Sequence, residues 1–277
     1  MYKIIVFFLL FHSLLWSESY EEKFWKDKEA HAKGLSLYSD IGYSSYVIEL
    51  DSSEMNSAID YNVLEYTLGL SYSYDRWMWG VYGKMLLNEL SSNMFVITTQ
   101  KPLNDNAKID KDEYGIYSNY VFSENSMHQW GVNFIYRYAQ LKGKDSYETF
   151  LSYQSNLSYL THGIALSLVY VQALSKKSSL VLKLGAVYSR AEVEMSESVN
   201  QQLQDSYVDD RVYALGTKMG LGYNYRLNKN FFLTSRIDGW KSNFASLSVQ
   251  SRVGDSLPSA SLREASLTSY TGLTWKF

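Results

Sequence analysis

The last eleven residues of the chain, Leu267 to Phe277, alternate apolar and polar side chains and end on an aromatic residue. In an extended strand, successive side chains point to opposite faces. One face of this segment carries Leu267, Leu273, Trp275 and Phe277, and the other carries Thr268, Tyr270, Gly272, Thr274 and Lys276. The alternation predicts a strand with one apolar and one polar face at the end of the chain.

This ending resembles the terminal strand of bacterial outer-membrane β-barrel proteins. In that family, a closing Phe preceded two residues earlier by an aromatic is the segment that the barrel assembly machinery recognises. The resemblance implies that Trp275 and Phe277 are an assembly signal and that this machinery is a partner. It implies an architecture and a location, the outer membrane of Gram-negative bacteria, but no particular activity.

The N-terminus indicates export. Lys3 precedes an apolar run from Ile4 to Leu15, and the small residues Ser17 and Ser19 follow. This order is typical of a secretory signal peptide, which we predict over residues 1–19. The alternative is a membrane anchor, but the run is shorter than the roughly 20 residues that a spanning helix needs.

The charged residues 20–33 do not follow a strand pattern. Glu22 and Lys26 have the i,i+4 spacing of a helix. We interpret this stretch as a periplasmic N-terminal segment, either a short helix or a flexible tail, and a plug inside the barrel is a further alternative.

Any membrane insertion of the rest of the chain must use strands, because polar residues interrupt every later apolar run before 18 residues. A closed barrel is the only sheet that leaves no unpaired edge in lipid. The chain is 46% hydrophobic and contains 25 Tyr, yet its mean hydropathy is only −0.25. These values fit a barrel, in which half of the strand residues face lipid and half face a polar lumen.

Alternating segments recur along the chain and predict hairpins. The clearest strand runs from Val63 to Tyr74, Asp75 and Arg76 form a turn, and a second strand begins at Trp77. Similar pairs flank turns near residues 124, 177 and 228, and a first strand near 35–50 and the terminal strand bring the count to ten. We therefore predict an all-β, antiparallel, up-and-down transmembrane barrel over residues 34–277. Twelve strands is the main alternative, if residues 141–161 form another hairpin, and eight is the next.

The lengths of the connections predict an orientation. The short turns alternate with longer polar stretches at about 51–61, 90–112, 141–161, 196–209 and 245–262. Short periplasmic turns and long extracellular loops are typical of outer-membrane barrels, so both chain ends are expected in the periplasm. Tyr and Trp near strand ends, such as Tyr72, Trp77 and Tyr223, are interpreted as an aromatic girdle. The alternative is an aromatic row in the core of a soluble sandwich.

The sequence lacks the usual signs of chemistry. The absence of Cys excludes thiolate metal sites, disulfides and cysteine nucleophiles, and a net charge of −3 without a basic stripe argues against a nucleic-acid partner. No His stands two residues before a Ser, as in outer-membrane phospholipases and lipid A deacylases, and no motif matches the omptin proteases. The acidic loops lack the glycine spacing of a calcium loop. We therefore predict no catalytic, cofactor-binding or metal-binding residues.

The inward faces of the predicted strands carry charged residues. The predicted interior charges are Glu65, Lys84, Arg137, Lys183, Lys218, Arg236 and Asp238, joined by Asp40 in the first strand. Charges inside a barrel must be paired or hydrated, and Glu65 and Lys84 are placed to pair across a hairpin. The set is compatible with a closed polar core or with a narrow water-filled path. We favour the closed core, because a ten-stranded lumen is small and large side chains such as Tyr82 and Tyr117 point into it.

These patterns predict a non-enzymatic outer-membrane barrel that displays extracellular loops for surface binding, adhesion or envelope integrity. Outer-membrane lipid and lipopolysaccharide are expected to surround it. One alternative is a narrow channel for small polar or anionic solutes. Another is a hydrolase at the outer rim, in which His162 would meet Asp209 or Asp210.

Overall fold

The computed structural model describes residues 33–51, 56–87, 90–92, 107–125, 127–148, 152–200, 202–247, 250–251 and 260–277. The predicted signal peptide and nearly all of the predicted periplasmic segment lie outside these residues. In the described part of the chain, no helix has the length and apolar character needed to cross a membrane.

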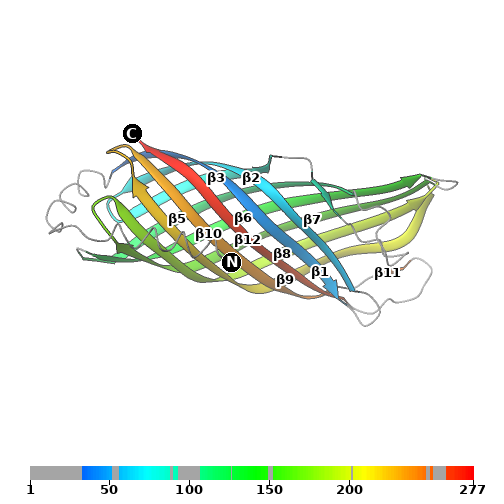
Figure 1. The fold of residues 1–277 in the computed structure, drawn as a ribbon. Coiled ribbons are helices and arrows are strands. Elements are labelled where there is room, and N and C mark those ends of the chain that lie inside the picture. The colour runs from blue at the N-terminus through cyan, green and yellow to red at the C-terminus, as the bar shows by residue number, and fades with distance from the viewer. Residues whose placement is uncertain are drawn as a thin grey trace, which may run out of the picture.

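Ten long antiparallel strands form a closed ring within the described residues (Figure 1). They are β1 (Gly34–Asp51), β2 (Asn56–Tyr74), β3 (Trp77–Leu86), β5 (Ala107–Glu124), β6 (His128–Glu148), β7 (Ser152–Ala173), β8 (Ser178–Val199), β9 (Gln202–Arg226), β10 (Phe231–Leu247) and β12 (Ala260–Lys276). Sequential long strands are neighbours, and β12 pairs with β1 to close the ring. Two short pieces, β4 (Leu90–Ser92) and β11 (Gln250–Ser251), pair with β5 and β9. The predicted ten-stranded up-and-down barrel is confirmed.

Short turns lie at one end of the barrel, as predicted. Asp75 adopts the left-handed conformation, with φ of 51°, between β2 and β3. Asn228 accepts hydrogen bonds from the backbone N–H groups of Asn230 and Phe231, at 2.9 Å each, and so shapes the turn before β10. The C-terminus lies at the same end, where the N–H of Phe277 donates to the carbonyl oxygen of Leu35 at 2.9 Å. Because periplasmic turns are short, we assign this end to the periplasm.

The opposite end differs from the sequence-based expectation. Residues 141–161 and 196–209 were predicted to be long polar loops, and this prediction is wrong. Instead, β6 continues to Glu148 and β7 begins at Ser152, so the segment lengthens two strands and adds no hairpin. The strands β8 and β9 likewise meet close to Asn200, whose φ is 51°. The polar residues there alternate with buried ones, as in a strand that has water on its outer side.

An apolar belt surrounds the barrel at the periplasmic half of the strands. Its exposed members include Leu37, Ile41, Leu68, Leu70, Val81, Ile116, Phe134, Leu166, Leu184, Leu215 and Leu273. The terminal strand has the predicted faces, because Leu267, Leu273, Trp275 and Phe277 are exposed while Thr268 and Tyr270 are buried. Such a belt is the surface that a transmembrane barrel presents to acyl chains.

Beyond the belt, the apolar side chains point inward. They form an extracellular core that consists of Tyr46, Ile48, Tyr61, Val63, Ala107, Ile109, Leu141, Leu157, Tyr159, Ala191, Val193, Val212, Ala214, Phe244, Leu247 and Leu262. Strand β8 shows the change, since Leu184 is 67% exposed and Val193 is 2% exposed. We call the strand segments around this core the extracellular extension. There the barrel has the interior of a soluble protein, because its outer surface faces water rather than lipid.

Candidate functional site: a cavity beneath a charged layer

Six charged side chains cross the lumen directly below the extracellular core. We call them the charged layer, and they are Glu65, Lys84, Lys111, Glu113, Arg137 and Glu264. They come from five strands, β2, β3, β5, β6 and β12. Three are acidic and three are basic, so the layer is balanced in charge.

Ion pairs connect the charged layer from one side to the other. Lys84 Nζ lies 3.5 Å from Glu65 Oε2 and 3.4 Å from Glu113 Oε1. Lys111 Nζ lies 3.3 Å from Glu65 Oε1. Arg137 places Nε 3.1 Å from Glu113 Oε2 and Nη2 3.2 Å from Glu264 Oε1. The six groups therefore form one alternating chain of charges, in which each buried charge has an opposite neighbour.

Tyrosine hydroxyls tie the charged layer to its surroundings. Tyr46 and Tyr159, both from the extracellular core, donate to the two carboxylate oxygens of Glu264 at 2.6 and 2.9 Å. On the other side, Tyr82 donates to Glu113 at 3.1 Å, and Lys84 donates to the Tyr270 hydroxyl at 2.7 Å. The layer and the core thus form one continuous packed block, and charge-assisted hydrogen bonds of this kind are among the strong ones.

A cavity of about 900 Å³ lies beneath the charged layer. Its lining begins at Lys84, Glu113 and Arg137 and continues to Asp75 and Arg76 at the periplasmic end. All ten long strands contribute to the lining, but the extracellular core contributes none of its residues. The lumen is therefore hollow toward the periplasm and filled toward the cell exterior.

One wall of the cavity is aromatic. Four tyrosines, Tyr38, Tyr82, Tyr117 and Tyr270, each lie over a glycine of the neighbouring strand: Gly69, Gly115, Gly80 and Gly42, respectively. A Cβ atom at these glycines would come within 2.5 Å of a ring atom, so the rings rest directly on the backbone. This arrangement is a way of covering glycine in a curved sheet. It gives the wall an apolar face with hydroxyl groups.

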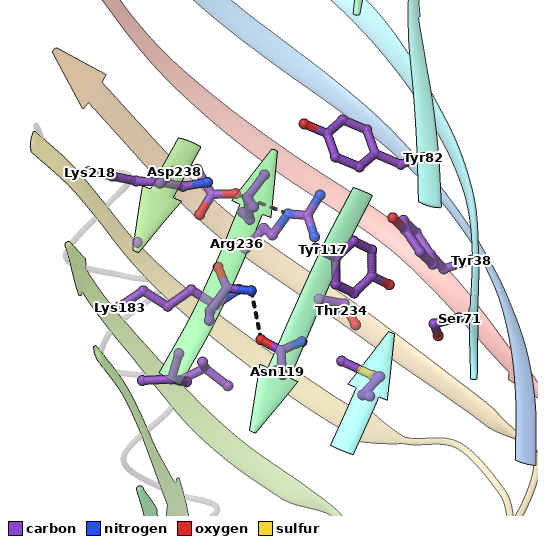
Figure 2. A pocket seen from close by; sticks show the side chains of 18 of the residues that line it. Tyr38, Ser71, Tyr82, Tyr117, Asn119, Lys183, Lys218, Thr234, Arg236 and Asp238 are labelled. Atoms are coloured by element: carbon purple, nitrogen blue, oxygen red, sulfur yellow. Dashed lines mark hydrogen bonds and ion pairs between the residues drawn. The ribbon is translucent and has the colours of Figure 1, made fainter. Parts of the chain in front are cut away.

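The opposite wall is basic. Arg236 lies between two carboxylates, with Nη2 2.8 Å from Asp40 Oδ2 and Nε 3.3 Å from Asp238 Oδ2. Lys183 and Lys218 project from β8 and β9, and Figure 2 shows them beside Arg236 and Asp238, across the cavity from the tyrosines. Among the residues that the structure describes, neither lysine has an ion-pair or hydrogen-bond partner. This wall, which we call the basic wall, comprises Asp40, Lys183, Lys218, Arg236 and Asp238.

Amide and hydroxyl groups complete the cavity. Asn133 donates to the Asn119 side-chain carbonyl at 2.7 Å, and Thr234 donates to Asn224 at 3.1 Å. The Asn133 carbonyl oxygen is buried and has no hydrogen-bond partner in the described structure. The cavity thus holds polar groups that a solute with its own donors could satisfy.

The predicted interior charges fall into two groups. Glu65, Lys84 and Arg137 belong to the charged layer, while Lys183, Lys218, Arg236 and Asp238 belong to the basic wall with Asp40. Sequence reasoning missed Lys111, Glu113 and Glu264. It placed Lys111 in a loop and did not extend the inward pattern of the neighbouring strands to Glu113 and Glu264. A signal was present, because Lys111 and Glu113 share the odd-numbered phase of the inward Tyr117, and Glu264 shares the even-numbered phase of Thr268.

The histidines of the described chain lie away from the cavity. His162 stands on the outer surface of the barrel, where its ring centroid is 6.4 Å from that of Tyr136. His128 Nδ1 is 2.6 Å from the Tyr170 hydroxyl near a periplasmic turn. The side chains of Asp209 and Asp210 lie outside the description. Within the described residues, no three acidic or histidine side chains gather as a metal-binding group.

Comparison with protein families finds no match, and comparison with curated proteins finds none either. Solved structures do match. The outer membrane protease OmpT from Escherichia coli has a TM-score of 0.63 and 9% identity, covering 88% of this chain and 97% of OmpT. The translocator domain of the autotransporter NalP from Neisseria meningitidis has a TM-score of 0.49 and 10% identity, covering 92% and 94%. The attachment invasion locus protein Ail from Yersinia pestis has a TM-score of 0.32 and 14% identity, covering 88% and 99%.

At these identities the likeness to OmpT shows the fold alone. The fold is that of a bacterial outer-membrane β-barrel, and the apolar belt is the surface that this fold places in the bilayer. The chain is therefore an outer-membrane barrel protein.

Proposed function

We propose that this barrel is a closed, non-enzymatic scaffold. Its role is to hold the extracellular extension and the connections above it at the cell surface, for surface binding, adhesion or envelope integrity. The observation that supports this proposal is the filled outer half of the lumen. The extracellular core and the charged layer occupy the space that a channel would need.

The packing of the core argues against a conducting path. Tyr46, Leu141, Tyr159 and Leu262 are at most 2% exposed, so they meet one another without a water-sized gap. An ion would have to displace these side chains and then separate the pairs of the charged layer. Leaving one partner of a buried pair without its counter-charge costs about 3–5 kcal/mol, which is prohibitive for a routine transport path.

The same core supports the display of the outer end. Each fully buried large apolar side chain contributes about 1.5–3 kcal/mol, so the extension is stable in water without help from lipid. Its strands are a rigid platform above the membrane rather than a set of loose loops. Rigid presentation favours binding, because little conformational entropy is lost when a partner docks.

The position of the histidines favours a role without catalysis. A hydrolase needs a base held against a nucleophile or an activated water. His162 instead contacts Tyr136 on the outside of the wall. The proposed scaffold therefore needs no residue of the lumen to react.

The test compares wild type with a variant that has shortened hairpins. Residues 146–154 and 195–208 are each replaced by an Asn-Gly turn, which removes the tips above the core and leaves the charged layer unchanged. We expect the variant to insert and to keep heat-modifiable migration on gels, but to lose the attachment or detergent resistance that wild type confers on cells. A variant that folds and retains both phenotypes in full would contradict the proposal.

A further inference from the structure

We infer that the cavity binds a small organic anion that enters from the periplasm, and that Lys183 and Lys218 supply the charge that holds it. This inference goes beyond the proposed scaffold role, which concerns the opposite end of the barrel. It depends on the charge, the space and the access of the basic wall.

The charges of the lumen leave these lysines without a counter-ion. The charged layer is balanced by its own pairs. Below it, Arg236 occupies both Asp40 and Asp238, so the basic wall has three cations and two anions. Lys183 and Lys218 have no ion-pair partner in the described residues. A cation inside a protein is costly unless it is paired, and a bound anion would supply the missing partner.

Asp238 is held away from the lysines. One of its oxygens faces Arg236, and the other lies 2.6 Å from where a Cβ atom would stand on Gly220. The carboxylate is therefore placed against the backbone of β9 rather than in the open space. The ammonium groups of Lys183 and Lys218 remain available to a solute.

The wall opposite the tyrosines is hollowed by small residues. Lys183 stands opposite Gly220 on the neighbouring strand, and Lys218 stands opposite Gly185. Because glycine has no side chain, each lysine has open space beside its stem. The resulting volume of about 900 Å³ lies within the range of roughly 300–1,000 Å³ that is usual for small-molecule sites.

The lining indicates the chemical class of the ligand. Two ammonium groups are suited to a phosphate or a carboxylate, while Tyr38 and Tyr117, whose ring centroids are 6.3 Å apart, offer an apolar surface across the cavity. Figure 2 shows the two walls facing each other. A solute with an anionic group and an apolar or cyclic body would contact both.

Access is restricted to the periplasmic end. The hydrogen-bonded ring of ten strands closes the wall, and the extracellular core closes the outer end. The lining reaches the exposed Asp75 and Arg76 at the short turns, where the cavity opens. A soluble periplasmic anion can enter there, whereas a bilayer lipid would have to pass through the wall.

The experiment uses phenyl phosphate as the probe and isothermal titration calorimetry on the refolded full barrel in a non-ionic detergent. We expect wild type to bind with a Kd below about 1 mM. The double variant Lys183→Met/Lys218→Met is expected to bind about tenfold more weakly or worse, because both charges are lost while the length of the side chains is kept. Lys177→Met, which removes one charge from a periplasmic turn, is the control and should leave the Kd unchanged.

Folding and ligand source are tested alongside. The double variant Lys183→Arg/Lys218→Arg keeps the charge and should retain binding, so a failure of the Met variant to fold does not prevent the test. Phenol, which lacks the anionic group, should not bind. The inference is overturned if wild type does not bind phenyl phosphate, if the Met and control variants bind equally, or if short-chain phosphatidylglycerol binds more tightly than the soluble probe.

Discussion

At the scale of single residues, Glu264 connects the two halves of the lumen. It is fully buried, and its carboxylate accepts hydrogen bonds from Tyr46 and Tyr159 above and from Arg137 beside it. Removal of this one group would leave a buried guanidinium with a single acid partner and two buried hydroxyls without an acceptor. The cost is therefore expected to exceed that of losing an ordinary ion pair.

We predict that Glu264→Ala lowers the free energy of unfolding by about 3–5 kcal/mol. Urea unfolding of the barrel in lipid vesicles, followed by gel migration, measures this loss. The control is Arg263→Ala, since Arg263 is the next residue on the strand and forms an exposed pair with Glu49 at 4.0 Å. Its loss should be below about 1 kcal/mol. Equal losses in the two variants would contradict the role of Glu264.

The glycines beneath the tyrosines are a second feature at this scale. A Cβ atom at Gly69 would lie 2.2 Å from Tyr38, whereas one at Gly83 would lie 3.5 Å from Tyr114, an ordinary contact. We expect Gly69→Ala to destabilise the barrel by about 1–3 kcal/mol, because the ring must leave its position. Gly83→Ala should be close to neutral in the same urea titration. A neutral Gly69→Ala would show that the aromatic wall is not rigid.

At the scale of elements, each strand changes its apolar face where it leaves the membrane. On β8, the even-numbered Leu182, Leu184 and Tyr188 are exposed, and farther along the odd-numbered Ala191 and Val193 are buried. The side chains keep alternating inside and outside, but the apolar residues pass from the lipid side to the lumen. The medium outside the wall, first lipid and then water, accounts for this change.

This change explains which parts of the fold could be predicted from the sequence. Leu182 to Tyr188 have the regular outward pattern of a membrane strand, and the hairpins were found from such segments. Glu192 and Glu194, which alternate with Ala191 and Val193, were counted as polar stretch because only an outward apolar face was expected. The strand count and orientation therefore followed from pattern, while the length of the extension and its core did not.

Charge at two positions on the same face of β8 tests the boundary. Leu184→Arg places a cation in the apolar belt and should cost about 2–4 kcal/mol, as expected near the middle of a bilayer. Glu194→Arg places the same side chain ten residues farther along the outer face, where it meets water. It should cost below about 1 kcal/mol. Reversible unfolding in vesicles measures both, and a similar cost at the two sites would mean that the boundary is misplaced.

Epitope insertion tests which end of the strands is outside. An epitope inserted after Asn200, in the tight turn between β8 and β9, should bind antibody on intact cells. The same epitope inserted after Lys177, in the turn between β7 and β8, should bind only after the outer membrane has been permeabilised. The reverse pattern would invert the orientation and, with it, the opening of the cavity.

At the scale of the whole molecule, the lumen has three tiers. The cavity faces the periplasm, the charged layer crosses the barrel, and the extracellular core fills the outer end. Sequence patterns placed charges on the inward faces but could not show this order. The partners of Glu264 lie 105 to 218 residues away along the chain, and only the closure of the ring brings them together.

The central claim is that this order closes the barrel to solutes, and planar-bilayer conductance tests it most directly. Purified wild-type barrel should insert without producing discrete openings at any voltage that the bilayer tolerates, while a general porin measured in the same bilayers conducts. Reproducible unitary openings of the wild type, with an anion selectivity that is lost on Arg236→Ala, would contradict the closed barrel.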